Sequence, residues 1–190
     1  QNEAAYGGGV CISGGIFTMT GGSITNCTVA AQNEGWTAWG GGICNYRNGS
    51  TTLSGTAKIQ DCRATATGTN NRHGGGLLNN GTLNISGDVM ISGCTADGNS
   101  DAVFTYSGTI SGGTFNGTVV NNLGTISGGM FYGGISGSGS ITGLTVTYRV
   151  DDKDYAMQVL QSGMTAQKPE EFTKDGCVFI GWYNGDTAYD

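Results

Sequence analysis

The side chains best suited to chemistry lie in three stretches of the chain, residues 28–39, 63–73 and 95–106. These stretches combine aromatic rings with amide, carboxylate, guanidinium and imidazole groups. Exposed rings flanked by such groups can stack on sugar rings while the polar groups reach the sugar hydroxyls. We therefore predict a ligand-binding edge for glycans or host surface proteins, made by Trp36, Trp39, Arg72, His73, Asp97, Asp101 and Tyr106. The alternative is that Trp36 and Trp39 only pack down onto the scaffold.

Catalytic chemistry is limited by the single histidine, His73. Any Ser-His-Asp or Cys-His system would need this residue, and a zinc motif with two histidines is excluded. Paired carboxylates remain, because glycosidases hold two carboxyl groups roughly 5–10 Å apart. Asp97 and Asp101 share one loop and are the best such pair. We expect no catalytic residue, no metal site and no cofactor.

The composition excludes several classes of partner. A formal net charge of −6 argues against nucleic acid and anionic membrane surfaces, since both require basic patches. The longest stretch without charge, residues 102–148, is rich in Gly, Ser, Thr and Asn, so the sequence predicts no membrane insertion. The 37 glycines do not follow the three-residue period of collagen.

Glycine triplets recur in the segments YGGGV, WGGGI and HGGGL. Their last glycines, Gly9, Gly42 and Gly76, are 33 and 34 residues apart. Each triplet precedes an apolar pair and three short segments of alternating apolar and polar residues, a pattern typical of strands joined by turns. Self-similarity at this period predicts a solenoid, and three strands per unit favour a parallel β-helix. The triplets then mark corners where positive φ or close backbone approach excludes a Cβ.

The same alignment places five of the six cysteines in equivalent positions. We expect one internal ladder of Cys27, Cys62 and Cys94 and a second of Cys11 and Cys44. The tight geometry of a disulfide disfavours bridges between strands stacked about 4.8 Å apart. Because cysteine packs as a small hydrophobe, free buried thiols are predicted.

The repeats resemble those of a known group of proteins. GGGICN followed by STTLSGTAKIQDC, and GGGLLNNGTLNISGDVMISGC, are similar to the repeats of bacterial cell-surface β-helix proteins of the pectate-lyase and adhesin type, over roughly residues 6–106. GTISGG recurs sixteen residues apart, at 108–113 and 124–129, which indicates narrower coils over 107–144. The resemblance, with the rule for parallel crossovers, implies a right-handed parallel β-helix over residues 1–144.

Composition changes near Leu144. DGCVFIGWYNG resembles the hallmark of the Listeria–Bacteroides repeat, also called the internalin B-type repeat, with Cys177 where a tyrosine is usual. This resemblance implies a small β-grasp-like module over residues 145–190, as all or part of one repeat, on a secreted or wall-attached bacterial protein. We expect its core to contain Val146, Tyr148, Val159, Phe172, Phe179 and Trp182.

The sequence thus predicts an all-β, extracellular bacterial protein of the cell surface or secreted, without catalytic activity. It would act as an adhesin-like or structural stalk that binds glycans or host proteins through its inter-coil segments. Two alternatives stay open: a polysaccharide lyase or glycoside hydrolase of the β-helix type, and a purely mechanical spacer with no ligand.

Overall fold

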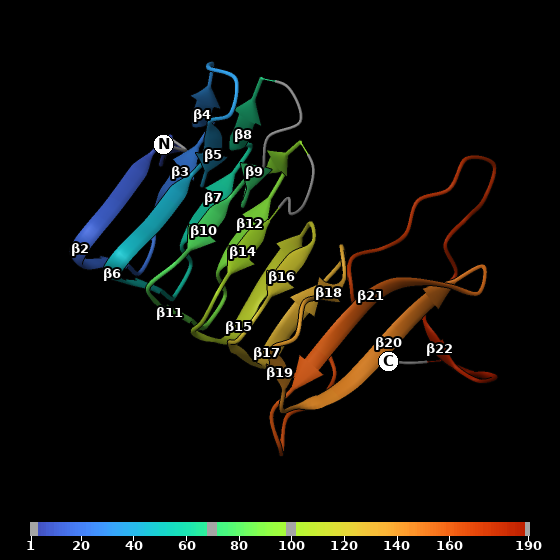
Figure 1. The fold of residues 1–190 in the computed structure, drawn as a ribbon. Coiled ribbons are helices and arrows are strands. Elements are labelled where there is room, and N and C mark those ends of the chain that lie inside the picture. Colours follow the sequence, from blue (N-terminus) through green and yellow to red (C-terminus); the bar gives the residue numbers. More distant parts are fainter. Residues whose placement is uncertain (1–3, 68–71, 98–101, 189–190) are drawn as a thin grey trace.

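A computed structural model describes residues 4–67, 72–97 and 102–188 (Figure 1). These residues form β-strands and no helix, and most of the strands pair in parallel. The prediction of an all-β protein is therefore confirmed. No helix among the residues described is long and apolar enough to cross a membrane.

The largest sheet contains the strands that surround the main core. It comprises β2 (Val10–Met19), β3 (Ser23–Thr25), β6 (Ile43–Leu53), β7 (Lys58–Gln60), β10 (Leu77–Asn79), β11 (Thr82–Ile85), β12 (Met90–Ser92), β14 (Val103–Thr105), β15 (Thr109–Asn116), β16 (Val119–Asn121), β17 (Thr125–Phe131), β18 (Ile135–Ser136), β19 (Ser140–Ile141), β20 (Leu144–Val150) and β21 (Lys153–Leu160). Up to β19 all of its pairs are parallel.

Two smaller parallel sheets lie outside it. One has the order β1 (Ala4–Tyr6), β5 (Thr37–Trp39), β9 (Arg72–His73), and the other β13 (Thr95–Ala96), β8 (Arg63–Ala66), β4 (Thr28–Ala31). A short antiparallel pair, β22 (Tyr183–Asn184) and β23 (Thr187–Ala188), lies near the C-terminal end.

The period predicted from the glycine triplets appears as the register of strand pairing. Val10 lies opposite Ile43, and Ile43 lies opposite Leu77. The step then shortens: Leu77 pairs with Val103, and Val103 with Val119, sixteen residues on. Both the 33- to 34-residue period and the shortening toward residue 144 are confirmed. Because equivalent residues face each other, their side chains form continuous columns through the core.

One such column shows how the core is packed. Ile59, Ile91, Phe115 and Phe131 are register neighbours and are all 0% exposed. The rings of Phe115 and Phe131 stack with their centroids 4.9 Å apart and their planes 7° from parallel. Because similar side chains recur at each level, each one packs against a neighbour of similar shape at the strand spacing. The interior is filled in the same way from level to level.

The glycine triplets form the predicted corners. The first glycine of the second triplet, Gly40, has φ of 68°, which L-residues rarely adopt. A Cβ on Gly41 would overlap the carbonyl oxygen of Gly75 and lie 2.5 Å from the backbone of Arg63. A Cβ on Gly42 would lie 2.7 Å from Ile59 Cγ2. Each position therefore excludes a side chain for its own reason.

Buried asparagines hydrogen-bond to the backbone at the bend within β6 and in the turn that follows β10. Asn45 Nδ2 donates to Asn79 Oδ1 at 2.6 Å, and Asn79 Nδ2 donates to Thr105 Oγ1 at 3.0 Å. Asn79 also accepts from Gly81 N at 3.2 Å. Buried polar groups need partners, and this ladder supplies them from one level to the next.

All six cysteines are free, as predicted. Cys44, Cys62 and Cys94 are buried, whereas Cys27, in the first unit of the residues described, is only partly buried. Cys11 and Cys44 lie opposite each other in the register, but Cys11 is exposed. Burial raises the pKa of Cys44 to about 12. The hydrogen bond to Cys62 and burial raise the pKa of Cys94.

This distribution gives a direct labelling experiment. In the native protein a thiol reagent is expected to modify Cys11 and Cys177 rapidly, and Cys44, Cys62 and Cys94 only on unfolding, because the last three side chains are buried and out of reach of the reagent. The hydrogen bond to Cys94 lowers the pKa of Cys62 to about 6, so burial alone must protect this thiol. Alkylation followed by mass spectrometry, with and without denaturant, measures the order of labelling. Rapid native labelling of Cys62 or Cys94 would contradict the ladder.

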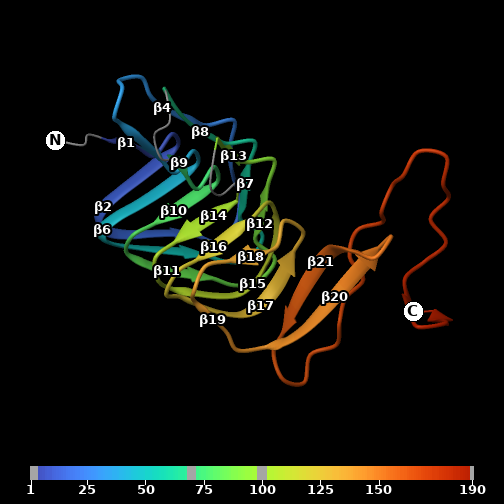
Figure 2. The ribbon, with the colours of Figure 1, turned by 45° about the vertical axis from the view of Figure 1, so that its right-hand side comes forward.

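The C-terminal part is attached to the sheet of the main core. Strands β20 and β21 form an antiparallel hairpin, and β21 pairs antiparallel with β17, with Val159 opposite Gly129. Figure 2 shows this hairpin at the end of the stack away from β2. The predicted core is partly corrected: Val159 packs into the main core because of this pairing. The β-grasp-like arrangement stays a prediction, since the residues described here form two separate hairpins.

A second cluster holds the rest of that predicted core. Tyr148 and Trp182 are buried with Met130 and Ala156, and Val146 and Phe179 pack against them. Phe172 contacts the ring of Tyr155 at 5.3 Å.

Candidate functional site

The described parts of the three stretches predicted to cluster at one edge come together through paired strands. Residues 28–39 contain β4 and β5, residues 63–73 contain β8 and β9, and residues 95–106 contain β13. β8 pairs with both β4 and β13, and β5 pairs with β9. A small core of Val29, Ala31, Ala38, Ala64 and Ala96 holds these strands together. Such small side chains allow two thin sheets to lie close together, so the edge is a rigid extension of the scaffold.

Six rings gather where this edge meets β6 and β14, and we call them the aromatic edge: Tyr6, Trp39, Tyr46, His73, Phe104 and Tyr106. Tyr6, Trp39 and His73 are register neighbours on β1, β5 and β9. The ring centroids of Tyr6 and Trp39 are 5.3 Å apart, and those of Tyr6 and Tyr46 are 4.8 Å apart.

The second half of the aromatic edge lies on the next levels of the stack. The ring of His73 lies 4.2 Å from that of Phe104, and Phe104 lies 5.2 Å from Tyr106. Phe104 is 8% exposed, whereas Tyr6 and Tyr106 are 36% and 39% exposed. The edge is therefore a row of rings with a buried base and an accessible tyrosine at each end.

Its electrostatics are nearly neutral. Burial lowers the pKa of His73 below its usual 6.5, so the imidazole is uncharged at pH 7. Burial and a hydrogen bond with Tyr46 raise the pKa of Tyr6 to about 12. The guanidinium of Arg47 lies 5.0 Å from the centre of the Tyr46 ring, in a cation–π contact. The indole Nε1 of Trp39 and Nδ1 of His73 make no hydrogen bond among the residues described.

The predicted site residues divide into three groups. Trp39, His73 and Tyr106 belong to the aromatic edge. Trp36 packs against the small core of the outer sheets, as the alternative interpretation holds. Arg72 and Asp97 contact each other, since Arg72 Nη1 donates to the carbonyl oxygen of Asp97 at 3.1 Å. Asp101 lies outside the residues described.

Tyr6 and Tyr46 were missed by the sequence analysis. Tyr6 could have been found, because it stands immediately before its glycine triplet, as Trp39 and His73 do before theirs. Tyr46 carries no such signal. It follows Asn45 on the long strand β6, and only the tertiary fold brings it to Tyr6.

The acidic residues of the edge make no catalytic pair among the residues described. The carboxylate of Asp97 forms an exposed ion pair with Arg63 at 3.3 Å. Within residues 4–67, 72–97 and 102–188, no three His, Cys, Asp or Glu side chains come together as a metal site.

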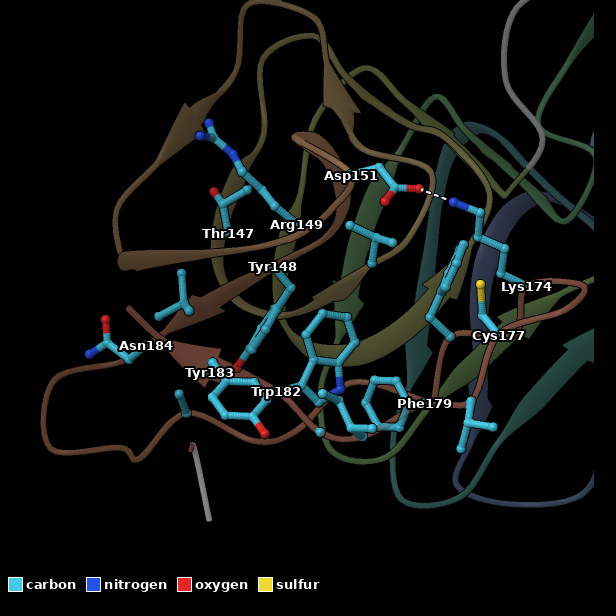
Figure 3. Close-up of a pocket in the computed structure, with 17 residues that line it drawn as sticks. Thr147, Tyr148, Arg149, Asp151, Lys174, Cys177, Phe179, Trp182, Tyr183 and Asn184 are labelled. Atoms are coloured by element: carbon cyan, nitrogen blue, oxygen red, sulfur yellow. Dashed lines mark hydrogen bonds and ion pairs between the residues drawn. The ribbon is translucent and has the colours of Figure 1, made fainter. Parts of the chain in front are cut away.

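A second concave feature lies in the C-terminal part (Figure 3). The pocket has a volume of about 810 Å³ and lies between β20 and the segment 177–184. Its wall includes Tyr148, Phe179 and Trp182, and Trp182 Nε1 has no hydrogen-bond partner among the residues described. At its rim Lys174 and Asp151 form an ion pair at 2.6 Å. The rim charges therefore neutralise each other, and the interior is apolar.

Comparison with known proteins bears on this part of the chain. No curated protein and no solved structure shows a significant match. The family model of the Listeria-Bacteroides repeat domain matches residues 145–190, so the resemblance noted in the sequence is confirmed for this segment. That repeat is typical of bacterial surface proteins, and the similarity to pectate-lyase-type repeats stays a prediction. The C-terminal segment thus carries a Listeria-Bacteroides repeat signature on a β-rich, repetitive scaffold.

Proposed function

We propose that the protein is a non-catalytic bacterial cell-surface or secreted protein in which a right-handed parallel β-helix presents the aromatic edge to glycans. The helical winding is supported by the pairing of equivalent residues at steps of 33, 34, 26 and then sixteen residues. The proposed boundary between this helix and the repeat module lies between residues 144 and 145, and the start of β20 at Leu144 supports it. The repeat match supports the surface location.

The aromatic edge is the observation that carries the binding proposal. Its rings are held in register by backbone pairing, so little ordering entropy is lost when a ligand stacks on them. Exposed faces of Tyr6 and Tyr106 offer apolar contact, and the guanidinium of Arg47, which lies over the Tyr46 ring, can reach sugar hydroxyl groups. The uncharged His73 and the net charge of −6 favour a neutral ligand over an anionic one.

The test is a glycan array followed by titration calorimetry on the best ligand. Since an aromatic contact contributes about 0.5–1.5 kcal/mol, the double variant Tyr6→Ala/Tyr106→Ala is expected to weaken binding roughly tenfold. The matched control is Tyr183→Ala, which removes an equally exposed tyrosine, 51% exposed, from the far end of the chain. An unchanged affinity in the double variant, or an equal loss in the control, would refute the aromatic edge as the binding face.

A purely mechanical spacer is the second candidate. Trp36 packs onto the small core and Phe104 is nearly buried, which is the packing that this alternative requires. Absence of binding to every glycan and to host surface proteins would favour it.

A further inference from the structure

The asparagines of the chain include two sets that differ in burial. Asn45, Asn79 and Asn121 are at most 2% exposed and hydrogen-bond inside the stack. Five others are exposed, and their side-chain amides make no hydrogen bond among the residues described: Asn26, Asn48, Asn80, Asn84 and Asn116. The buried set supports the fold, whereas the exposed set offers free amide groups to solvent.

The exposed set shares a sequence pattern that the buried set lacks. Each of the five is followed two positions later by a hydroxyl residue, with no proline between: Thr28, Ser50, Thr82, Ser86 and Thr118. The buried set has Arg47, Gly81 and Leu123 at that position. Asn-x-Ser/Thr is the acceptor pattern for sugar attachment to an asparagine amide at a protein surface. We call these five segments the acceptor triplets.

The acceptor triplets that begin at Asn48 and Asn80 occupy the same corner on successive levels of the stack. Their hydroxyl residues, Ser50 and Thr82, lie opposite each other in the pairing of β6 with β11. Asn48 has φ of 60°, a left-handed conformation that asparagine adopts more readily than most residues, at the bend within β6. Both amides therefore lie on the outside of a bend, where a transferring enzyme can reach them.

The middle residue of both triplets is glycine. A Cβ on Gly81 would overlap the carbonyl oxygen of Gly49, and a Cβ on Gly49 would overlap Asn45 Oδ1. Because the packing admits no side chain here, nothing bulky stands between the amide and the hydroxyl of either triplet. Thr82 is exposed, and its hydroxyl makes no hydrogen bond among the residues described.

The other three triplets are less available. Thr118 Oγ1 donates to the carbonyl oxygen of Gly133 at 3.3 Å, so the hydroxyl of the triplet 116–118 is engaged. In the triplet 84–86 the middle residue, Ile85, is 1% exposed and belongs to β11, so this backbone is fixed in a strand. Cys27, the middle residue of the triplet 26–28, packs against the main core.

We propose that Asn48 and Asn80 are sites of N-linked glycosylation, with a sugar diphosphate as the donor. In the transfer, Nδ2 of the asparagine forms a bond to the anomeric carbon of the sugar. The bond from that carbon to the diphosphate oxygen breaks, and its electron pair leaves with the diphosphate. The amide nitrogen releases one proton to a base of the transferring enzyme. This modification does not depend on glycan binding by the aromatic edge.

The experiment is site-resolved mass spectrometry of peptides from the protein isolated from its native host. Peptides that contain Asn48 or Asn80 are expected to carry one or more sugar residues. Their occupancy should exceed that of peptides with Asn84 or Asn116, because those triplets are held in a strand or have an engaged hydroxyl. Absence of sugar from both Asn48 and Asn80 would overturn the proposal.

Variants produced in the same host test whether the triplet is what the enzyme recognises. Ser50→Ala and Thr82→Ala are each expected to abolish modification of the asparagine two positions before, although that asparagine is unchanged. Thr82→Ser keeps the hydroxyl and should retain the sugar. The matched control, Thr109→Ala, removes an exposed hydroxyl outside the triplets and should leave both sites modified. Modification that persists in both alanine variants, or that is lost equally in the control, would contradict the assignment.

The source of the donor is identified with unmodified protein and fractions of the host cell. Transfer by the soluble fraction supplied with sugar nucleotides would indicate a nucleotide-linked donor. Transfer that requires the membrane fraction would indicate a lipid-linked donor. Either result at Asn48 and Asn80 supports the proposal, since both donors present the same sugar diphosphate.

Discussion

Replacement of Gly41 by alanine is expected to cost about 5 kcal/mol or more of unfolding free energy, at the upper limit for a single substitution. The added Cβ would overlap the carbonyl oxygen of Gly75 and approach the backbone of Arg63, and neither can rotate away. Both belong to neighbouring paired strands or corners, so relief requires separating two levels of the stack. The protein would fold only with the second corner displaced.

Gly21→Ala is the matched control, because the nearest atom to its new Cβ would be Thr56 Oγ1 at 3.5 Å, an ordinary contact. Its unfolding free energy should stay within about 0.5 kcal/mol of the parent value. Urea denaturation followed by circular dichroism measures both variants. Equal stability of the two would show that the corner is looser than its geometry indicates.

Asn79→Ala is expected to lower the unfolding free energy by about 4 kcal/mol, since each buried group left without a partner costs about 1–3 kcal/mol. Asn79 is 0% exposed and its amide joins three levels. It accepts from Asn45, and it donates to Thr105 Oγ1 and to the carbonyl of Ser107 at 2.8 Å. Removing it leaves polar groups on both sides unpaired in a dry interior.

Two further variants separate hydrogen bonding from packing. Asn79→Leu restores most of the volume but none of the hydrogen bonds, so it should be nearly as destabilised as Asn79→Ala. Asn80→Ala changes the exposed neighbour, whose side chain makes none of these contacts, and should cost less than about 0.5 kcal/mol. A leucine variant as stable as the parent would show that the ladder contributes only volume.

The features that the sequence predicted are those that repeat. Gly9, Gly42 and Gly76 set the register, because one steric requirement recurs at each corner and excludes every other residue type. The cysteine column followed from the same alignment. Repetition makes a local signal strong enough to read without knowing the fold.

The features that sequence analysis missed depend on single tertiary contacts. Because β21 pairs with β17, Val159 lies in the main core. No periodic pattern in the sequence predicts this antiparallel contact. Tyr46 joins the aromatic edge only because the fold brings the first residues of β6 close to Tyr6. No periodic pattern of the sequence indicates the proposed ligand. The candidate site was therefore located from the contacts between the rings in the structure.

The register of the stack also determines how the protein bears a pulling force. Hydrogen bonds between register partners run along the stack, so tension between its two ends loads them one level at a time rather than all together in shear. Release of a 33-residue level frees roughly 110 Å of chain, and a sixteen-residue level about half of that. A surface protein built in this way would lengthen in steps of three sizes, because the level from Leu77 to Val103 is intermediate. The narrow levels beside the hairpin would give shorter extensions than the wide levels that carry the aromatic edge.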